Sequence, residues 1–193
     1  MTRLVGVLGS VTPPGRLHAA LDFALSAAVL DTPGVETRLI DLGDHRIGFA
    51  DGRPLEQLTD DTPALVRAVA EADAVLFASP VYRGSYTGAL KNFLDLLPVE
   101  ALLGKPCGII AMGATQHHYL GVDWHLRDVL TWFGAFVAPS SVYLASADFQ
   151  DGALVDTAKE DLRALVATLL RLLSVAQQSE ALLGPTPLAA KRR

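Results

Sequence analysis

Residues 4–34 read LVGVLGSVTPPGRLHAALDFALSAAVLDTPG, and this stretch decides the fold. The unbroken apolar run Leu4–Leu8 predicts a buried strand. A polar loop follows, and from Leu17 to Leu30 apolar residues recur at helical spacing until Pro33 and Gly34 end the pattern. A buried strand that leads through a loop into such a helix is the repeating unit of a parallel α/β fold.

The same alternation continues along the chain. Further strands are predicted at residues 35–42, 74–78, 107–112 and 141–144, and further helices at residues 63–72, 87–97, 118–133 and 156–173. This pattern fits an α/β, flavodoxin-like, doubly wound five-stranded parallel sheet in the order 2-1-3-4-5, with helices on both faces. In that order a ligand binds beyond the carboxyl ends of the first and third strands.

Two stretches depart from the regular alternation. Residues 43–62 contain several glycines, prolines and aspartates and predict a long loop. Residues 179–193 predict a flexible C-terminal tail, so that residues 1–178 form a single domain.

Composition excludes several classes of protein. The net charge of −5 and the pI near 5.4 argue against a nucleic-acid partner. The single cysteine, Cys107, lies in an apolar run and is interpreted as a buried hydrophobe. The absence of a long apolar run and of signal-peptide features predicts a cytoplasmic protein that has no membrane partner.

The loop after the first predicted strand, GSVTPPGRLH at residues 9–18, leads straight into a helix. A helix N-terminus offers unpaired N–H groups and partial positive charge, which suit a phosphate. Ser10 and Thr12 add hydroxyl groups, and Arg16 adds a forked cation. The loop matches neither a P-loop nor a dinucleotide-binding motif, and an ordinary capped turn is the alternative interpretation.

The loop after the third predicted strand, SPVYRGSYTG at residues 79–88, also has two interpretations. Val81 and Tyr82 can lie against a flat aromatic ring while backbone groups bind its edge. The alternative is a turn followed by a helix cap at Ser85 or Thr87.

The loop after the fourth predicted strand, MGATQHHY at residues 112–119, is rich in small residues that let the backbone approach a ligand. Thr115 and a histidine can bind a polar ring edge. A metal site is the weakest interpretation, because the paired histidines have no partner ligands at suitable spacing. A catalytic triad is not supported, because Ser10 lacks the Gly-x-Ser-x-Gly motif.

Together these loops resemble the NADPH-dependent FMN reductase family, most closely the FMN reductases of two-component alkanesulfonate monooxygenase systems. The motifs are GS and PGR in the first loop, SPVYRGSYTGALKN at residues 79–92, and GAT, HYL and VD at residues 113–115, 118–120 and 122–123. The resemblance covers most of residues 3–175.

The resemblance implies an NAD(P)H:FMN oxidoreductase that supplies reduced flavin to a partner monooxygenase. It implies FMN and NADPH or NADH as cofactors, a homodimer or homotetramer, no metal and no catalytic side chain, because the flavin carries the hydride. The cofactor-binding residues that it implies are Ser10, Gly15, Arg16, Leu17, His18, Pro80, Val81, Tyr82, Arg83, Gly113, Ala114, Thr115 and His118.

The chain departs from the family pattern at Gly15 and Leu17, where members usually carry hydroxyl residues. This departure predicts weaker FMN binding, which suits a flavin that is released. Trp124 and Trp132 fit either the core or a subunit interface. The resemblance implies the interface, and also an extra residue, a π-bulge, near Trp124.

Other functions stay open. FMN can stay bound while a quinone, an azo compound or a metal oxyanion is reduced. A flavodoxin-type electron carrier is less favoured, because the first loop lacks the usual Thr/Ser/Gly-rich sequence, and a non-enzymatic binding module is also conceivable. The sequence does not separate NADH from NADPH, although Arg83 or Arg53 can bind a 2′-phosphate.

Overall fold

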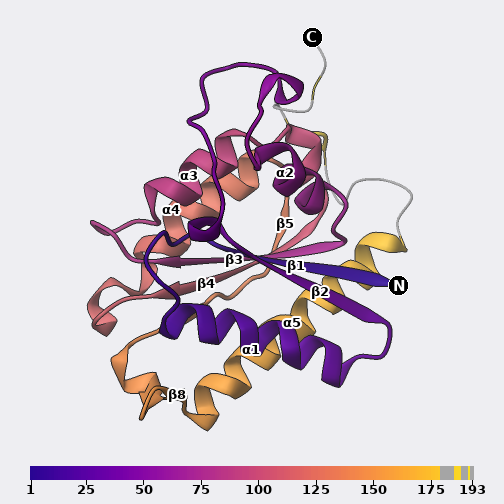
Figure 1. Cartoon of the computed structure of the whole chain (residues 1–193). Coiled ribbons are helices and arrows are strands. Elements are labelled where there is room, and N and C mark those ends of the chain that lie inside the picture. The colour runs from indigo at the N-terminus through magenta and orange to yellow at the C-terminus, as the bar shows by residue number, and fades with distance from the viewer. Residues whose placement is uncertain (179–184, 188–190, 192–193) are drawn as a thin grey trace.

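The computed structural model describes residues 1–178, 185–187 and 191, so most of the predicted tail at 179–193 lies outside the described residues. Within them a six-stranded parallel sheet has the order β2-β1-β3-β4-β5, with β6 also paired to β4 (Figure 1). The predicted flavodoxin-like order is confirmed. The strands are β1 (Thr2–Leu8), β2 (Val35–Asp41), β3 (Ala74–Pro80), β4 (Pro106–Met112), β5 (Phe136–Val137) and β6 (Val142–Leu144).

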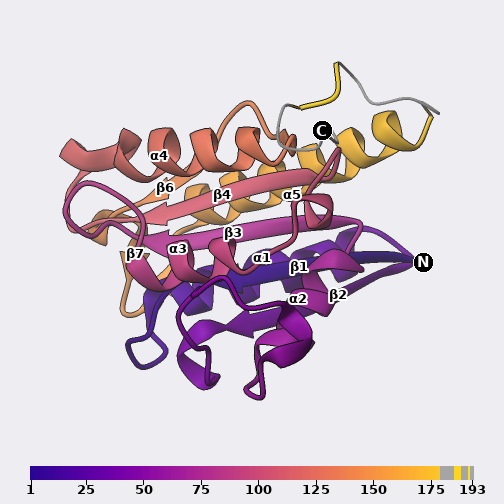
Figure 2. The same ribbon diagram turned by 90° about the horizontal axis from the view of Figure 1, so that it is seen from above.

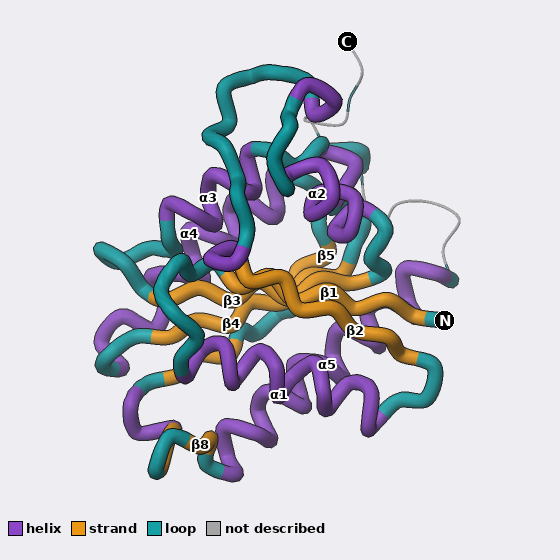
Figure 3. Tube along the Cα trace, viewed as in Figure 1, coloured by secondary structure: helices purple, strands orange, loops and turns teal. Residues whose placement is uncertain are grey.

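Helices cover both faces of the sheet, as predicted (Figures 1 and 3). Helices α1 (Arg16–Asp31) and α5 (Asp156–Gln177) lie on one face, and α2 (Thr62–Ala70), α3 (Gly88–Asp95) and α4 (Tyr119–Trp132) lie on the other. Alternate residues of each strand feed the two cores, because successive side chains of a strand point to opposite faces. In β1, for example, Val5 and Val7 pack under α2–α4, whereas Leu4 and Leu8 pack under α1 and α5.

The fifth strand differs from its prediction, because a bulge divides it into β5 and β6. Four residues, 138–141, lie opposite only two residues of β4, 108–109. Pro139 within this bulge has no N–H to donate to a neighbouring strand. Arg127 of α4 fixes the bulge, since its guanidinium donates to the Ala138 carbonyl at 2.8 Å and to the Asp123 carboxylate at 2.7 Å.

The predicted loop at residues 43–62 is irregular except for two 3₁₀ turns, η1 (Leu42–Asp44) and η2 (Leu55–Gln57). The side chain of Asn92 on α3 fastens it: its amide donates to the Gly48 carbonyl at 2.9 Å and accepts from the Ala50 N–H at 2.9 Å. The Asp60 carboxylate also accepts from the Gly48 N–H at 2.8 Å. The first part of this loop is therefore held against α3.

The structure differs from the predictions in two further features: it contains a hairpin that was not predicted, and it lacks a π-bulge that was expected in α4. A small hairpin of β7 (Phe149–Gln150) and β8 (Ala153–Leu154) precedes α5. Its Asp151-Gly152 turn has positive φ at both residues, 51° and 83°, which is typical of a tight hairpin turn. The expected π-bulge near Trp124 is wrong, since α4 is α-helical throughout.

In Figure 2 the strands run away from the labelled N-terminus, so the loops after β1, β3 and β4 gather at the opposite edge of the sheet. The remaining short 3₁₀ turns are η3 (Val99–Ala101), η4 (Gln116–His118) and η5 (Ser146–Asp148). Among the described residues, no helix combines the length and the apolar character needed to cross a bilayer.

Candidate functional site

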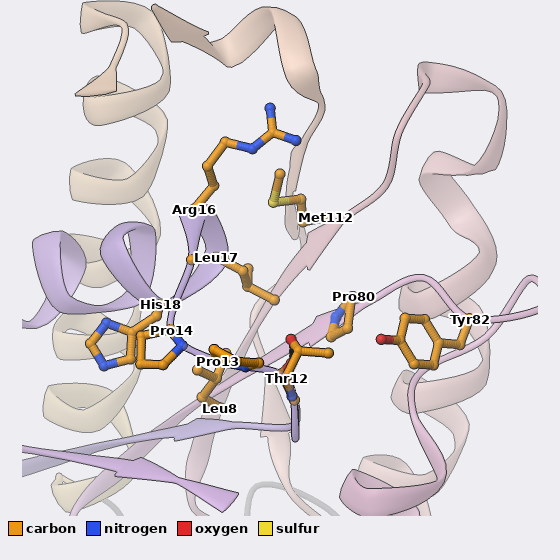
Figure 4. A pocket seen from close by; sticks show the side chains of 12 residues that line it. Leu8, Thr12, Pro13, Pro14, Arg16, Leu17, His18, Pro80, Tyr82 and Met112 are labelled. Carbon is orange, nitrogen blue, oxygen red and sulfur yellow. Dashed lines mark hydrogen bonds between the residues drawn. The ribbon is translucent and has the colours of Figure 1, made fainter. Parts of the chain in front are cut away.

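A pocket of about 170 Å³ opens where β1 and β3 end, between the first and second loops (Figure 4). It brings together predicted site residues from both loops and adds neighbours that were not predicted. The predicted cofactor-binding residues in its lining are Ser10, Gly15, Arg16, Leu17, His18, Pro80 and Tyr82. Thr12, whose hydroxyl the sequence also offered to a phosphate, lines it too, and the added residues are Leu8, Pro13, Pro14 and Met112. The other predicted residues, Val81, Arg83, Gly113, Ala114, Thr115 and His118, lie outside this lining.

The start of α1 forms one wall of the pocket. Gly15 precedes the helix and offers no side chain to cap its first N–H groups, which belong to Arg16, Leu17 and His18. Ser10 is buried beside them, and its hydroxyl shares a hydrogen bond of 2.8 Å with Thr12. An uncapped helix start next to hydroxyl groups can bind an anion.

Arg16 lines the pocket but is held to one side of it. Its guanidinium carbon lies 5.3 Å from the centre of the Phe149 ring, which β7 supplies. Figure 4 shows the Arg16 side chain directed away from Thr12 and Pro80, whereas Leu17 points toward Pro80. Leu17 therefore gives this part of the pocket an apolar surface.

The second loop is a tight hairpin. Tyr82 and Ser85 exchange backbone hydrogen bonds of 2.8 and 3.0 Å, and the two residues between them have positive φ, 54° at Arg83 and 78° at Gly84. A left-handed conformation at Arg83 costs about 1 kcal/mol. The hairpin packs against α4, because a Cβ at Gly121 would lie only 2.5 Å from the Gly84 carbonyl oxygen.

Thr87 caps α3, which decides between the two predicted caps. Its hydroxyl accepts from the Leu90 N–H at 3.1 Å and donates to the Gly9 carbonyl at 2.5 Å. Its own N–H donates to the buried Ser79 hydroxyl at 3.1 Å. The first and second loops are thus joined through one buried threonine.

The third loop is held by strands on either side of it. The Val81 N–H donates to the Met112 carbonyl at 2.8 Å, and the Gly113 N–H donates to the Leu144 carbonyl at 3.0 Å. The Tyr143 hydroxyl of β6 donates to the Thr115 carbonyl at 2.5 Å. Tyr143 was missed from the sequence, because nothing there reveals which residue of an edge strand reaches a neighbouring loop.

Comparison with known proteins identifies the family. The model of the NADPH-dependent FMN reductase family matches residues 2–150. The chain belongs to this family. The "NAD(P)H-dependent FAD/FMN reductase" of Geobacillus thermodenitrificans is 39% identical over 149 residues, which cover 77% of this chain and 80% of the relative. The "FMN reductase (NADPH)" of Pseudomonas aeruginosa is 34% identical over 153 residues, which cover 79% of this chain and 82% of the relative.

Solved structures agree with the fold. The apo form of the NADH:FMN oxidoreductase EmoB has a TM-score of 0.76 and 25% identity, and the match covers 100% of this chain and 97% of that one. As an FMN reductase of this family, the chain is an NAD(P)H:FMN oxidoreductase whose cofactors are FMN and a nicotinamide nucleotide.

The residues present fit FMN. The flavin combines an anionic phosphate with a flat, largely apolar ring. The uncapped start of α1 and the buried Ser10 hydroxyl suit the phosphate. The side chains of Leu17, Pro80 and Tyr82 suit the ring.

Proposed function

We propose that this FMN reductase uses NAD(P)H to reduce FMN and then releases the reduced flavin to a partner monooxygenase. The reaction class follows from family membership. The observation that carries the release is the composition of the pocket wall: Gly15 has no side chain and Leu17 is apolar, so the start of α1 offers a phosphate its backbone N–H groups but few side-chain donors.

We expect the FMN phosphate to bind at the start of α1. The N–H groups of Arg16, Leu17 and His18 follow Gly15 there, and the Ser10 hydroxyl lies in the same lining. Arg16 lines the same pocket, and a turn of its guanidinium from the Phe149 ring toward the phosphate would add a positive charge there.

The flavin ring would lie between the second and third loops. A volume of about 170 Å³ is smaller than the ~300 Å³ of a typical small-molecule site, so this pocket would hold the phosphate end of FMN and only the near edge of the ring, at Leu17, Pro80 and Tyr82. The ring would then lie beyond Pro80, with the residues that line its two edges supplied by neighbouring loops. These residues are Val81, Tyr82 and Arg83 on one side and Gly113, Ala114, Thr115 and His118 on the other.

The flavin supplies the hydride chemistry when it is bound, and the protein binds and orients it. Few side chains in the first loop would hold the phosphate. Leu17 is apolar, Gly15 has no side chain, and the hydrogen bond between Ser10 and Thr12 uses one of their two hydroxyl protons, which leaves one for the phosphate. Binding should therefore be weak enough for the reduced flavin to leave.

We also propose a homodimer or homotetramer formed through α4. Trp124 and Trp132 on this helix are 63% and 58% exposed. Trp132 lines a groove of about 440 Å³ between α3 and α4, whose other apolar lining residues are Leu94, Leu97, Val129 and Phe133 and whose charged ones are Lys91, Asp95 and Asp128. Large exposed aromatic side chains beside an apolar groove are typical anchors of a subunit interface.

Two measurements on the purified protein test the release. We expect little flavin absorbance near 450 nm as isolated, and NAD(P)H oxidation that depends on added FMN and saturates with it. A yellow protein that oxidises NAD(P)H only when a quinone or azo compound is added would contradict the release and favour bound FMN. Running NADH and NADPH in parallel decides which nicotinamide the chain prefers.

A further inference from the structure

Tyr143 connects the edge of the sheet with the third loop. Its hydroxyl donates to the Thr115 carbonyl at 2.5 Å, and its ring packs against the core beneath α2–α4. The same hydroxyl fills the space above Gly113, where a Cβ would collide with it. One side chain therefore touches both ends of the segment Gly113–Thr115.

The position of Tyr143 depends on the bulge between β5 and β6. The bulge moves the register on by two residues, which sets Tyr143 opposite Ala111 of β4. Arg127 holds the start of the bulge through the Ala138 carbonyl, and Asp123 holds Arg127. The Leu144 carbonyl then fixes the Gly113 N–H at 3.0 Å. The chain is therefore held both before Tyr143, at Ala138, and directly after it, at Leu144.

We propose that Tyr143 is a positioning residue, which fixes the third loop and thereby determines how tightly the flavin ring is bound. This inference rests on the proposed function, in which the loop lies at the ring and not at the phosphate. Tyr143 is not part of the lining of the phosphate pocket. Its loss should therefore weaken flavins with and without a phosphate by the same factor.

The side chain is suited to this role at neutral pH. Burial raises the pKa of the Tyr143 phenol above its usual value of 10.0, so the hydroxyl keeps the proton that it donates. A backbone carbonyl is the acceptor, so the hydrogen bond does not depend on the ionisation of a second side chain.

The test is titration of the full chain with FMN and with riboflavin, followed by flavin fluorescence. Tyr143→Phe removes only the hydroxyl, and a net hydrogen bond of ordinary strength corresponds to a rise of about fivefold in both dissociation constants. Gly113→Ala attacks the same contact from the other side and should weaken both flavins at least as much. Ser174→Ala, which removes the hydroxyl of an exposed residue near the end of α5, is the control and should change neither.

A second pair of measurements separates positioning from a purely structural role. Ser10→Ala should weaken FMN while leaving riboflavin unchanged, so the ratio of the two constants identifies which end of the flavin is affected. Thermal melting of each apoprotein reports on stability alone.

The inference is overturned if Tyr143→Phe lowers the melting temperature but leaves both affinities within twofold of wild type, or if it weakens FMN alone. If the wild-type chain binds no flavin, the proposed function fails together with the inference. If the wild-type chain binds flavin, and Tyr143→Phe and Gly113→Ala bind both flavins as tightly as wild type, the inference alone fails and the proposed function stands.

Discussion

The Thr87 hydroxyl donates to the carbonyl oxygen of Gly9 at 2.5 Å, and this contact joins two loops that are far apart in the sequence. Gly9 is also the residue whose Cβ, if present, would lie 2.6 Å from the Cβ of Leu90 on α3. The first loop therefore sits directly on the start of α3, and the shape of the pocket depends on that packing.

Replacing Thr87 by valine should loosen this junction. Valine has nearly the same side-chain shape as threonine but no hydroxyl. The variant therefore loses the cap of α3 and the hydrogen bond to Gly9, which together contribute about 2 kcal/mol to the free energy of unfolding. Urea denaturation of the apoprotein measures the loss. Thr87→Ser keeps the hydroxyl and should retain most of the stability, so a valine variant as stable as wild type would contradict the assignment.

Replacing Arg16 by alanine should reduce FMN affinity by at least about tenfold, because a charge-assisted hydrogen bond contributes about 1.5–3 kcal/mol. Riboflavin has no phosphate and should bind as in wild type. Isothermal titration with both flavins measures the difference. Arg16→Lys retains the charge and should lie in between. An equal loss for both flavins would mean that Arg16 acts on the ring and not on the phosphate.

Asp123 should make part of the stability depend on pH. Burial raises the pKa of this carboxyl, but the hydrogen bonds from Arg127 and Ser141 and the charge of Arg127 outweigh it, and the pKa lies below its usual value of 3.8. Because the folded-state pKa is depressed, the stabilisation by the carboxylate is complete above about pH 5, and it is lost as the pH falls through the unfolded-state value and then the folded-state pKa.

The test is a series of denaturation curves between pH 7 and pH 3 for wild type and Asp123→Asn. The variant leaves Arg127 without its counter-charge, so we expect it to be less stable at pH 7 by about 2 kcal/mol. The gap between the two proteins should narrow toward pH 3. A gap that stays constant over this range would show that the carboxylate charge is not involved.

Replacing Trp132 by glutamate should shift the protein toward the monomer, because a charge in an apolar interface loses its hydration without a partner. Light scattering behind a size-exclusion column at micromolar concentration measures the mass. Leu30→Glu is the control, since Leu30 is a 78% exposed apolar residue on α1, away from α4. A wild-type chain that elutes as a monomer would contradict the proposed interface.

Cys107 should be inert in the native protein. It is fully buried in β4, and burial raises the pKa of its thiol to about 12, so almost no thiolate forms at pH 8. A disulfide reagent should label it only after urea is added. Labelling of the native protein at the rate of a free cysteine would mean that the strand opens readily.

Much of the fold was predictable because its central strands are buried on both faces. Their sequences are continuous apolar runs, such as Leu4–Leu8, and these runs are separated by helices of regular period. The predicted boundaries of α1 and β4 differ from the structure by a single residue at each end or less.

The edge of the sheet was less predictable. At the edge formed by β5 and β6 the strands are only two and three residues long, which is too short for an alternating pattern, and the bulge at residues 138–141 interrupts what pattern there is. The β7–β8 hairpin was too short to detect, although its Asp151-Gly152 pair is a turn signal. Without that hairpin, the sequence offered no reason to place Phe149 against Arg16.

Within the site, the residues that follow strands directly were predictable, because strand order determines which loops meet. Contacts that depend on register were not. Tyr143 reaches Thr115 only because the bulge advances the strand by two residues, and that shift is a property of the folded sheet.

The fastening of residues 43–62 by Asn92 has a practical consequence. The chain beyond Ala50 forms a short turn at Asp51–Arg53, where Gly52 has a φ of 84° and open space on its Cβ side. The bonds to Gly48 and Ala50 isolate this turn from the sheet. A fluorescent reporter or an affinity tag inserted at Gly52 can therefore be carried by the enzyme with the flavin pocket undisturbed.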